Sequence, residues 1–240
     1  MRLVVIGSVL ILLAAPPAFA GGFNLTWGTG CWSDSPASLR TFACDTNTGS
    51  VSLVASFEND GYPLSTNFLK GRLDLQSDSP LLPDWWQIGG VGACRTGSLS
   101  VSTDFLGAPG GCVDFWQGQP PTVGFHWVTT AVPDVYAPPS APNRARLNVR
   151  TGILSRSFPI EPGVEYYAFR VTIDFARSVG ACTGCATPAT LVLNELEYSG
   201  DLVTTPLANA CLRWQAAGVT PCSATPARNP TWGQVKGLYR

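Results

Sequence analysis

Charged side chains are scarce in this 240-residue chain, in which Asp, Glu, Lys and Arg together make up 13% of the sequence. Lysine occurs only at Lys70 and Lys236, and the formal net charge is −1. A chain so close to neutrality lacks the basic surface that nucleic-acid binding needs, so no nucleic-acid partner is expected. His126 is the only histidine, which excludes a metal site built from several histidines.

Long apolar runs are missing after the first twenty residues. Residues 1–20 combine a basic start at Arg2, an apolar stretch over 3–15 and the A-x-A cleavage signature Ala18-Phe19-Ala20. We therefore predict a signal peptide over 1–20 and an exported protein, located outside the cell, at its surface or in the periplasm. No transmembrane segment is expected after cleavage.

No segment has the pattern of a long helix, whereas glycine and proline are abundant, with 25 and 20 residues. Alternation of apolar and polar residues, typical of half-buried strands, recurs in eight segments. These segments are 23–27, 51–57, 68–75, 99–105, 123–129, 144–151, 167–175 and 191–198. The spacing predicts an all-β fold, a disulfide-stabilised β-sandwich or jelly-roll over 21–226, with a closed or partly open β-barrel as the alternative.

The longest alternation, over 164–198, predicts a hairpin with Cys182 and Cys185 at its tip. All eight cysteines follow the signal peptide, and an even count in an exported chain predicts a disulfide framework. Their grouping favours pairing between sequence neighbours: Cys31–Cys44, Cys94–Cys112, Cys182–Cys185 and Cys211–Cys222. A redox pair or a zinc site at 182–185 is the less favoured interpretation, and no metal or cofactor is expected.

The last fourteen residues, 227–240, form a cationic tail in which Thr231 and Gln234 fit a helix capping box. We interpret the tail either as a recognition element for an export or anchoring system or as a short helix docked on the domain. Several motifs resemble those of an uncharacterised family of exported, cysteine-rich bacterial proteins. They are Leu-Pro-Asp-Trp-Trp-Gln (82–87), Ala-Cys-Arg (93–95), Pro-Asn-Arg-Ala-Arg (142–146), Glu-Tyr-Tyr-Ala-Phe (165–169), Cys-Thr-Gly-Cys (182–185) and the final Thr-Trp-Gly-Gln-Val-Lys-Gly-Leu-Tyr-Arg (231–240). The resemblance implies export and brings no known activity.

Two groups of residues are candidates for ligand binding. Trp85 and Trp86 lie in a loop, where one exposed ring could stack on a sugar while the other is buried; packing of both rings is the alternative. Arg144, Arg146 and Arg150 line one face of their strand and are suited to a sulfated or uronic polymer or to phosphate. Pairing of these arginines with carboxylates of a neighbouring strand is the alternative.

The sequence contains no complete catalytic motif. Glu195 and Glu197 share a strand face at a separation of about 7 Å, close to that of inverting glycosidases. Asp45 and Asn47 resemble the start of a calcium loop, but the third ligand and the distal glutamate are missing, and a tight Asx turn is the favoured explanation. His126 lacks a nucleophile motif and fits an ordinary strand histidine.

We therefore predict a non-enzymatic, exported binding module at the cell exterior, with a glycan or surface partner as its ligand. The alternatives are a structural component of the cell surface or matrix and, second, a glycoside hydrolase.

Overall fold

The structure is a computed structural model that describes residues 22–59, 63–90, 92–129, 141–198 and 209–215, and the backbone of 201–203. Within these ranges no helix has the length and apolar character needed to cross a bilayer. The predicted signal peptide, Cys222 and the cationic tail lie outside the described residues.

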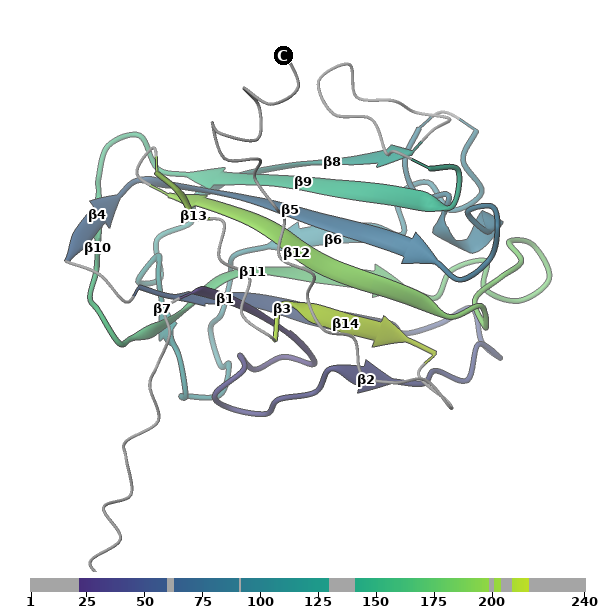
Figure 1. The fold of residues 1–240 in the computed structure, drawn as a ribbon, viewed down its shortest axis with the longest axis horizontal. Coiled ribbons are helices and arrows are strands. Elements are labelled where there is room, and N and C mark those ends of the chain that lie inside the picture. The colour runs from purple at the N-terminus through teal and green to yellow at the C-terminus, as the bar shows by residue number, and fades with distance from the viewer. Residues whose placement is uncertain are drawn as a thin grey trace, which may run out of the picture.

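Two β-sheets pack face to face, and neither closes into a barrel (Figure 1). The all-β sandwich predicted from the sequence is therefore confirmed. The smaller sheet has the order β1-β3-β11-β6, with β7 beside β11. Its strands are β1 (Gly22–Trp27), β3 (Ser50–Glu58), β11 (Glu165–Asp174), β6 (Leu99–Ser102) and β7 (Val113–Asp114).

The larger sheet has seven strands in the order β2-β14-β12-β5-β9-β8, with β13 beside β12. Its strands are β2 (Leu39–Arg40), β14 (Cys211–Trp214), β12 (Ala189–Tyr198), β5 (Phe68–Ser77), β9 (Arg144–Gly152), β8 (Thr122–Thr129) and β13 (Asp201–Val203). A separate two-stranded ladder joins β4 (Leu64–Thr66) to β10 (Phe158–Ile160). All eight strands predicted from alternation are present, although the one expected over 99–105 ends at Ser102.

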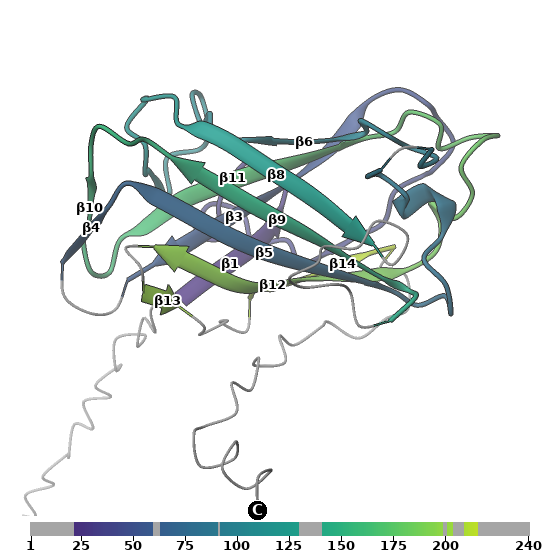
Figure 2. The ribbon, with the colours of Figure 1, turned by 90° about the horizontal axis from the view of Figure 1, so that it is seen from above.

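The predicted hairpin over 164–198 is wrong. β11 pairs with β3, β6 and β7 in the five-stranded sheet, whereas β12 pairs with β5, β13 and β14 in the seven-stranded sheet. The two strands lie in different layers of the sandwich (Figure 2). The segment between them crosses from one sheet to the other, and this turn-rich connection has the composition of a hairpin loop without its geometry.

A β-bulge in β11 changes which side chains face the core. The pairing of β11 with β3 shifts between Tyr167 and Phe169. As a result Phe169 points into the main core, whereas Tyr167 packs in a smaller cluster on the outer side of the sheet. Simple alternation had placed both side chains on one face.

Tryptophans dominate one end of the core. The ring centroid of Trp214 lies 4.6 Å from that of Trp85, 5.3 Å from that of Trp86 and 4.0 Å from that of Phe42. Trp85 and Trp86 belong to the short 3-10 helix η1 (Asp84–Trp86), which turns both rings inward. Such aromatic clusters bury large apolar areas and fix the packing of the sheets.

The buried side chain of Arg95 joins η1 to the end of β11 at this end of the core. Its side chain is fully buried, its guanidinium lies 3.8 Å from the centre of the Trp85 ring, and it donates hydrogen bonds to the carbonyl oxygens of Trp85, Asp174 and Ala176. Burial lowers the pKa of Arg95 to about 10, partly offset by Asp174, so the group stays charged at neutral pH.

Three disulfides join segments far apart in the sequence: Cys31–Cys112, Cys44–Cys185 and Cys94–Cys182. The predicted pairs Cys31–Cys44, Cys94–Cys112 and Cys182–Cys185 are therefore wrong, because folding brings together loops that are distant in the sequence. Cys211 is also disulfide-bonded. The structural role predicted for the cysteines is confirmed for these seven, and their thiols are not available as zinc ligands.

Candidate functional site

The outer face of the seven-stranded sheet is lined with charged and polar side chains from four neighbouring strands. Alternation along β5 and β9 turns every second side chain away from the core. We call this surface the charged face. It comprises Lys70, Arg72, Asp74 and Gln76 of β5, Arg144, Arg146, Asn148 and Arg150 of β9, Asn194, Glu195 and Glu197 of β12, and Gly124 and His126 of β8.

Glu195 and Glu197, the candidate acids of a hydrolase, are both held by cations. Glu197 Oε1 lies 2.7 Å from Lys70 Nζ, and Glu195 Oε2 lies 2.6 Å from Arg72 Nη2. These pairs join β12 to β5 across neighbouring positions of the ladder. Each carboxylate thus serves as one half of a cross-strand ion pair, and the two do not face each other across a cleft as hydrolytic acids do.

The three arginines of β9 share one face, as predicted, but their partners differ. Arg146 Nε lies 2.5 Å from Asp74 Oδ1, and Arg144 Nη2 lies 2.9 Å from Gln76 Oε1. Arg150 is exposed, and within the described part of the chain it forms no ion pair or hydrogen bond through its side chain. Arg146 is therefore paired with a carboxylate in contact with solvent, whereas the guanidinium of Arg150 remains available to a ligand.

A groove of about 500 Å³ lies beside Arg150. Gly124 of β8 is the cross-strand neighbour of Arg150, and a Cβ at Gly124 would meet no atom within 4 Å outside its immediate chain neighbours. One position further along the same ladder, His126 pairs with Asn148. A guanidinium, an imidazole and an amide thus surround an open floor, and the two β5–β12 ion pairs complete the lining. The isolated glycine inside a strand pattern was the sequence signal for this opening.

A second groove, of about 470 Å³, lies at the opposite end of the charged face. Its most prominent cation is Arg213, which is nearly buried and whose Nη2 lies 2.9 Å from Asp78 Oδ2. Arg213 also donates to the Thr190 hydroxyl. Because both terminal nitrogens of Arg213 are engaged by Asp78 and Thr190, the second groove offers a weaker site for an anion than the groove beside Arg150.

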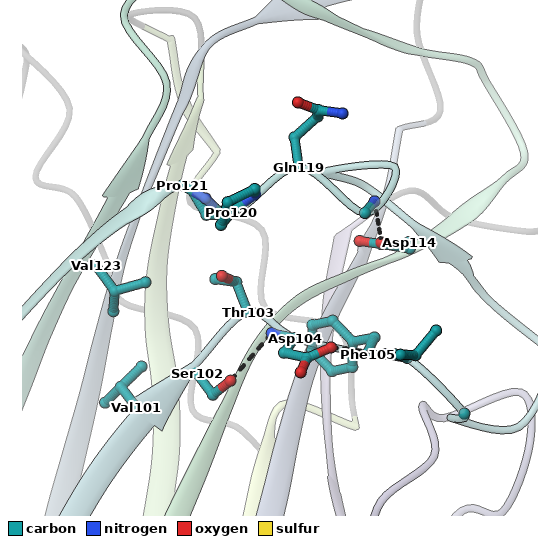
Figure 3. A pocket seen from close by; sticks show the side chains of 13 residues that line it. Val101, Ser102, Thr103, Asp104, Phe105, Asp114, Gln119, Pro120, Pro121 and Val123 are labelled. Atoms are coloured by element: carbon teal, nitrogen blue, oxygen red, sulfur yellow. Dashed lines mark hydrogen bonds between the residues drawn. The ribbon is translucent and has the colours of Figure 1, made fainter.

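An apolar slot of about 730 Å³ opens between the edges of the two sheets, where β6 ends and β8 begins (Figure 3). Its apolar lining consists of Val101, Phe105, Leu106, Pro120, Pro121 and Val123. Two carboxylates border it, but each stabilises its own turn: Asp104 accepts a hydrogen bond from the Leu106 amide at 2.9 Å, and Asp114 accepts one from the Gly118 amide at 2.7 Å. The slot therefore presents mainly apolar surface.

Trp85 and Trp86 are both fully buried in the main core. The prediction of an exposed tryptophan face at this position is therefore wrong, because η1 directs both rings inward where alternation would have separated them. Of the seven tryptophans in the described ranges, six are buried and Trp32 is half-buried. A sugar-stacking platform is thus not provided by the residues predicted for it.

The outer face of the five-stranded sheet, which we call the covered face, is overlaid by loops in the region around Tyr167. The Cys31–Cys112 disulfide packs there with Val54, Phe105 and Tyr167 in a small buried cluster. The Phe105 and Tyr167 rings stack at a centroid distance of 4.3 Å. This face is therefore shielded where the charged face is open.

Glu165 lies beneath these loops as a buried carboxylate. It accepts hydrogen bonds from the Ser33 amide and hydroxyl, the Ser56 hydroxyl and the Asn24 side-chain amide. Donors from three segments thus satisfy the charge. This network was not predicted, because a glutamate in an ordinary strand pattern gives no sign that loops will bury it.

The Tyr167 hydroxyl lies 2.7 Å from Asp34 Oδ2 and 2.6 Å from the Pro109 carbonyl oxygen. Burial raises the pKa of Tyr167 well above its ordinary value, and the hydrogen bond and negative charge of Asp34 raise it further. Both neighbours are acceptors, so the hydroxyl keeps its proton and acts as a donor that fastens the loops to β11.

The remaining candidates occupy structural positions. His126 is an exposed strand histidine, as its sequence context indicated. Asn47 exchanges hydrogen bonds with the Val179 backbone, accepting one at 2.8 Å and donating one at 3.2 Å. Its side chain is therefore engaged in joining two loops, which favours the structural interpretation of Asp45 and Asn47 over a calcium loop.

No family model and no curated protein matches the chain. Among solved structures it is similar to AvmM, which catalyses macrocyclisation in alchivemycin A biosynthesis, with 12% identity and a TM-score of 0.34 over 85% of this chain and 92% of that one. It is also similar to the second type II cohesin module from the cellulosomal adaptor ScaA scaffoldin of Acetivibrio cellulolyticus, with 11% identity and a TM-score of 0.33 over 79% of this chain and 92% of that one.

Proposed function

We propose that the protein is an exported, non-enzymatic binding module that holds an acidic glycan, one bearing carboxylate or sulfate groups, on the charged face. The observation that carries the proposal is Arg150: an exposed guanidinium beside an open groove, with no ion-pair partner in the described chain. A guanidinium binds carboxylate or sulfate oxygens through paired N–H groups, which adds directional specificity to charge attraction.

The surroundings of Arg150 favour a polymer with hydroxyl groups over a free ion. Asn148 and His126 place an amide and an imidazole along the same groove. Amide and imidazole groups have the donors and acceptors needed to bind sugar hydroxyls. The floor at Gly124 lets a ring lie close to the sheet. The ion pairs of β5 and β12 keep the rest of the face near charge balance, so specificity depends on the unpaired arginine.

The direct test compares polygalacturonate and heparin with a neutral polymer, dextran, by isothermal titration calorimetry. We expect the wild type to bind an acidic polymer and to lose affinity as salt is added, because the contact is ionic. Arg150→Ala should lower the affinity by about tenfold, the usual scale for a hydrogen bond to a charged group. The matched control is Arg156→Ala, which removes an exposed arginine elsewhere and should leave affinity unchanged.

Gly124→Glu provides a second test that preserves Arg150. A glutamate at this position would be the cross-strand neighbour of Arg150 and would pair with it, so acidic polymers should no longer bind. Gly124→Ser, which adds a side chain without charge, should retain most of the affinity. Equal binding of dextran and the acidic polymers by the wild type would contradict the proposal.

A further inference from the structure

The free edge of the seven-stranded sheet is open over one half of β8 and closed over the other. Toward the end of the strand, Trp127, Val128 and Thr129 are buried. Gly89 lies so close that a Cβ there would approach the Trp127 carbonyl oxygen to 2.8 Å. Over Thr122–His126, which we call the open edge, the residues are exposed or half-exposed, and no strand in the described ranges pairs with their outer side.

The open edge lacks the features with which proteins usually prevent edge-to-edge pairing. It contains no Lys, Asp, Glu or Pro, and Pro120 and Pro121 directly precede it. Its order is polar, apolar, glycine, apolar, polar (Thr-Val-Gly-Phe-His), which is symmetric about Gly124. Phe125 remains 45% exposed although it lies on the core side of the strand. The strand thus presents unpaired backbone and apolar surface together.

We infer that the open edge pairs with the open edge of a second copy of this chain, antiparallel and centred on Gly124. In this register each Phe125 lies opposite the partner copy's Val123 and each His126 opposite its Thr122, so like meets like and no charges clash. Such a contact is isologous, as closed dimers require. Paired apolar side chains would also extend the lining of the slot between β6 and β8, to which Val123 already belongs.

The pairing places two binding grooves on one continuous surface. An axis normal to the sheet relates antiparallel edge strands, so both charged faces point the same way. With strands about 4.8 Å apart, the Arg150 backbones of the two copies lie about 14 Å apart, beyond the distance at which salt screens exposed charges. A polymer that binds one groove would therefore reach the other. Only this bridging of two grooves rests on the proposed function; the pairing of the two edges does not.

The contact involves five residues a side and is smaller than the roughly 1,200 Å² of stable complexes, so we expect a dissociation constant of about 100 µM. Sedimentation velocity of the ligand-free full chain, from about 10 µM to about 1 mM, should show reversible dimerisation in this range. A chain that stays monomeric throughout would overturn the inference and leave the edge free.

Charge variants test the register. Phe125→Lys and Val123→Glu should each abolish dimerisation, whereas the double variant should restore it, because position 125 faces position 123 of the other copy. Leu154→Lys, which changes a fully exposed leucine elsewhere, is the matched control and should dimerise normally. Circular dichroism confirms folding of each variant. A double variant that remains monomeric, or a control that fails with the others, contradicts the proposed pairing. Sedimentation measures dimerisation, whereas calorimetry measures glycan binding by Arg150. Failure of the dimer proposal can therefore be distinguished from failure of the proposed function.

Discussion

Both outer faces of this sandwich carry glutamates, and they hold these carboxylates in opposite ways. On the covered face, the Cys31–Cys112 disulfide and its loops bury Glu165 and Tyr167 within a network of hydrogen bonds. On the charged face, Glu195 and Glu197 pair with cations in contact with solvent. The covered face is built for stability, since an unsatisfied buried polar group is costly. The charged face contributes little stability and keeps Arg150 available.

Removal of the Cys31–Cys112 disulfide should have the largest effect on this contrast. The double variant Cys31→Ala/Cys112→Ala should lose about 3–4 kcal/mol of unfolding free energy, because the bond closes a long loop. Urea denaturation of the purified protein measures the change. Removing a link across the charged face with Lys70→Ala/Glu197→Ala should lose less than about 1 kcal/mol. Similar losses in the two double variants would refute the distinction between the faces.

Two glutamates allow the same contrast to be tested with one atom exchanged. Glu165→Gln replaces one carboxylate oxygen by an NH₂ group, which then faces either the Ser33 donors at Oε2 or the Ser56 and Asn24 donors at Oε1, so about 2 kcal/mol of stability should be lost. Glu197→Gln, in contact with solvent, should lose about 0.5 kcal/mol. Chemical denaturation at pH 7 gives both values. The interpretation fails if Glu165→Gln proves as mild as Glu197→Gln.

Alkaline pH should remove the stability that Tyr167 contributes on the covered face. We expect this loss to be smaller than those in the two preceding predictions. The pKa of Tyr167 is raised in the folded protein, so its stabilising effect is complete below about pH 10, the ordinary tyrosine value, and is lost as the pH rises from there. Tyr167→Phe should lose about 1 kcal/mol at pH 8 through the missing hydrogen bond. The difference in unfolding free energy between wild type and Tyr167→Phe, measured by urea denaturation, should be smaller at pH 10.5 than at pH 8. A difference that stays constant with pH would show that Tyr167 ionises normally.

Local alternation was sufficient to predict the strands, because apolar residues recur at the core-facing positions of each long strand even where the opposite side is buried as well. It was insufficient at Tyr167, where the bulge reverses the facing of the side chain, and at Trp85 and Trp86, where a 3-10 turn replaces an extended segment. The disulfide pairing was predicted wrongly for a different reason, because distance along the sequence does not indicate which loops come together when the two sheets pack. Short strands such as β2 and β14 carry too few residues for a period to show.

The candidate site was predicted in part. The arginine row on β9 shares one face as expected, but the sequence could not reveal which arginine lacks a carboxylate partner, because partners come from the register of β5 and β12. Arg146 faces Asp74 in that register, whereas Arg150 faces Lys70. The groove depends on Gly124, whose effect appears only when β8 lies beside β9.

The parallel pairing of β2 with β14 has a consequence for how the chain acquires its structure. Leu39 and Arg40 find their partners only at Arg213 and Trp214, and the Leu25 amide donates its hydrogen bond to the Asn209 carbonyl oxygen. A polypeptide emerging from its N-terminus first must therefore wait, with its earliest strands unsealed, until almost all of it has appeared. Closure between such remote segments is slow compared with local helix or turn formation. We therefore expect the sandwich to be completed late, after the residues near 209–214 are available to join the segment over 25–40.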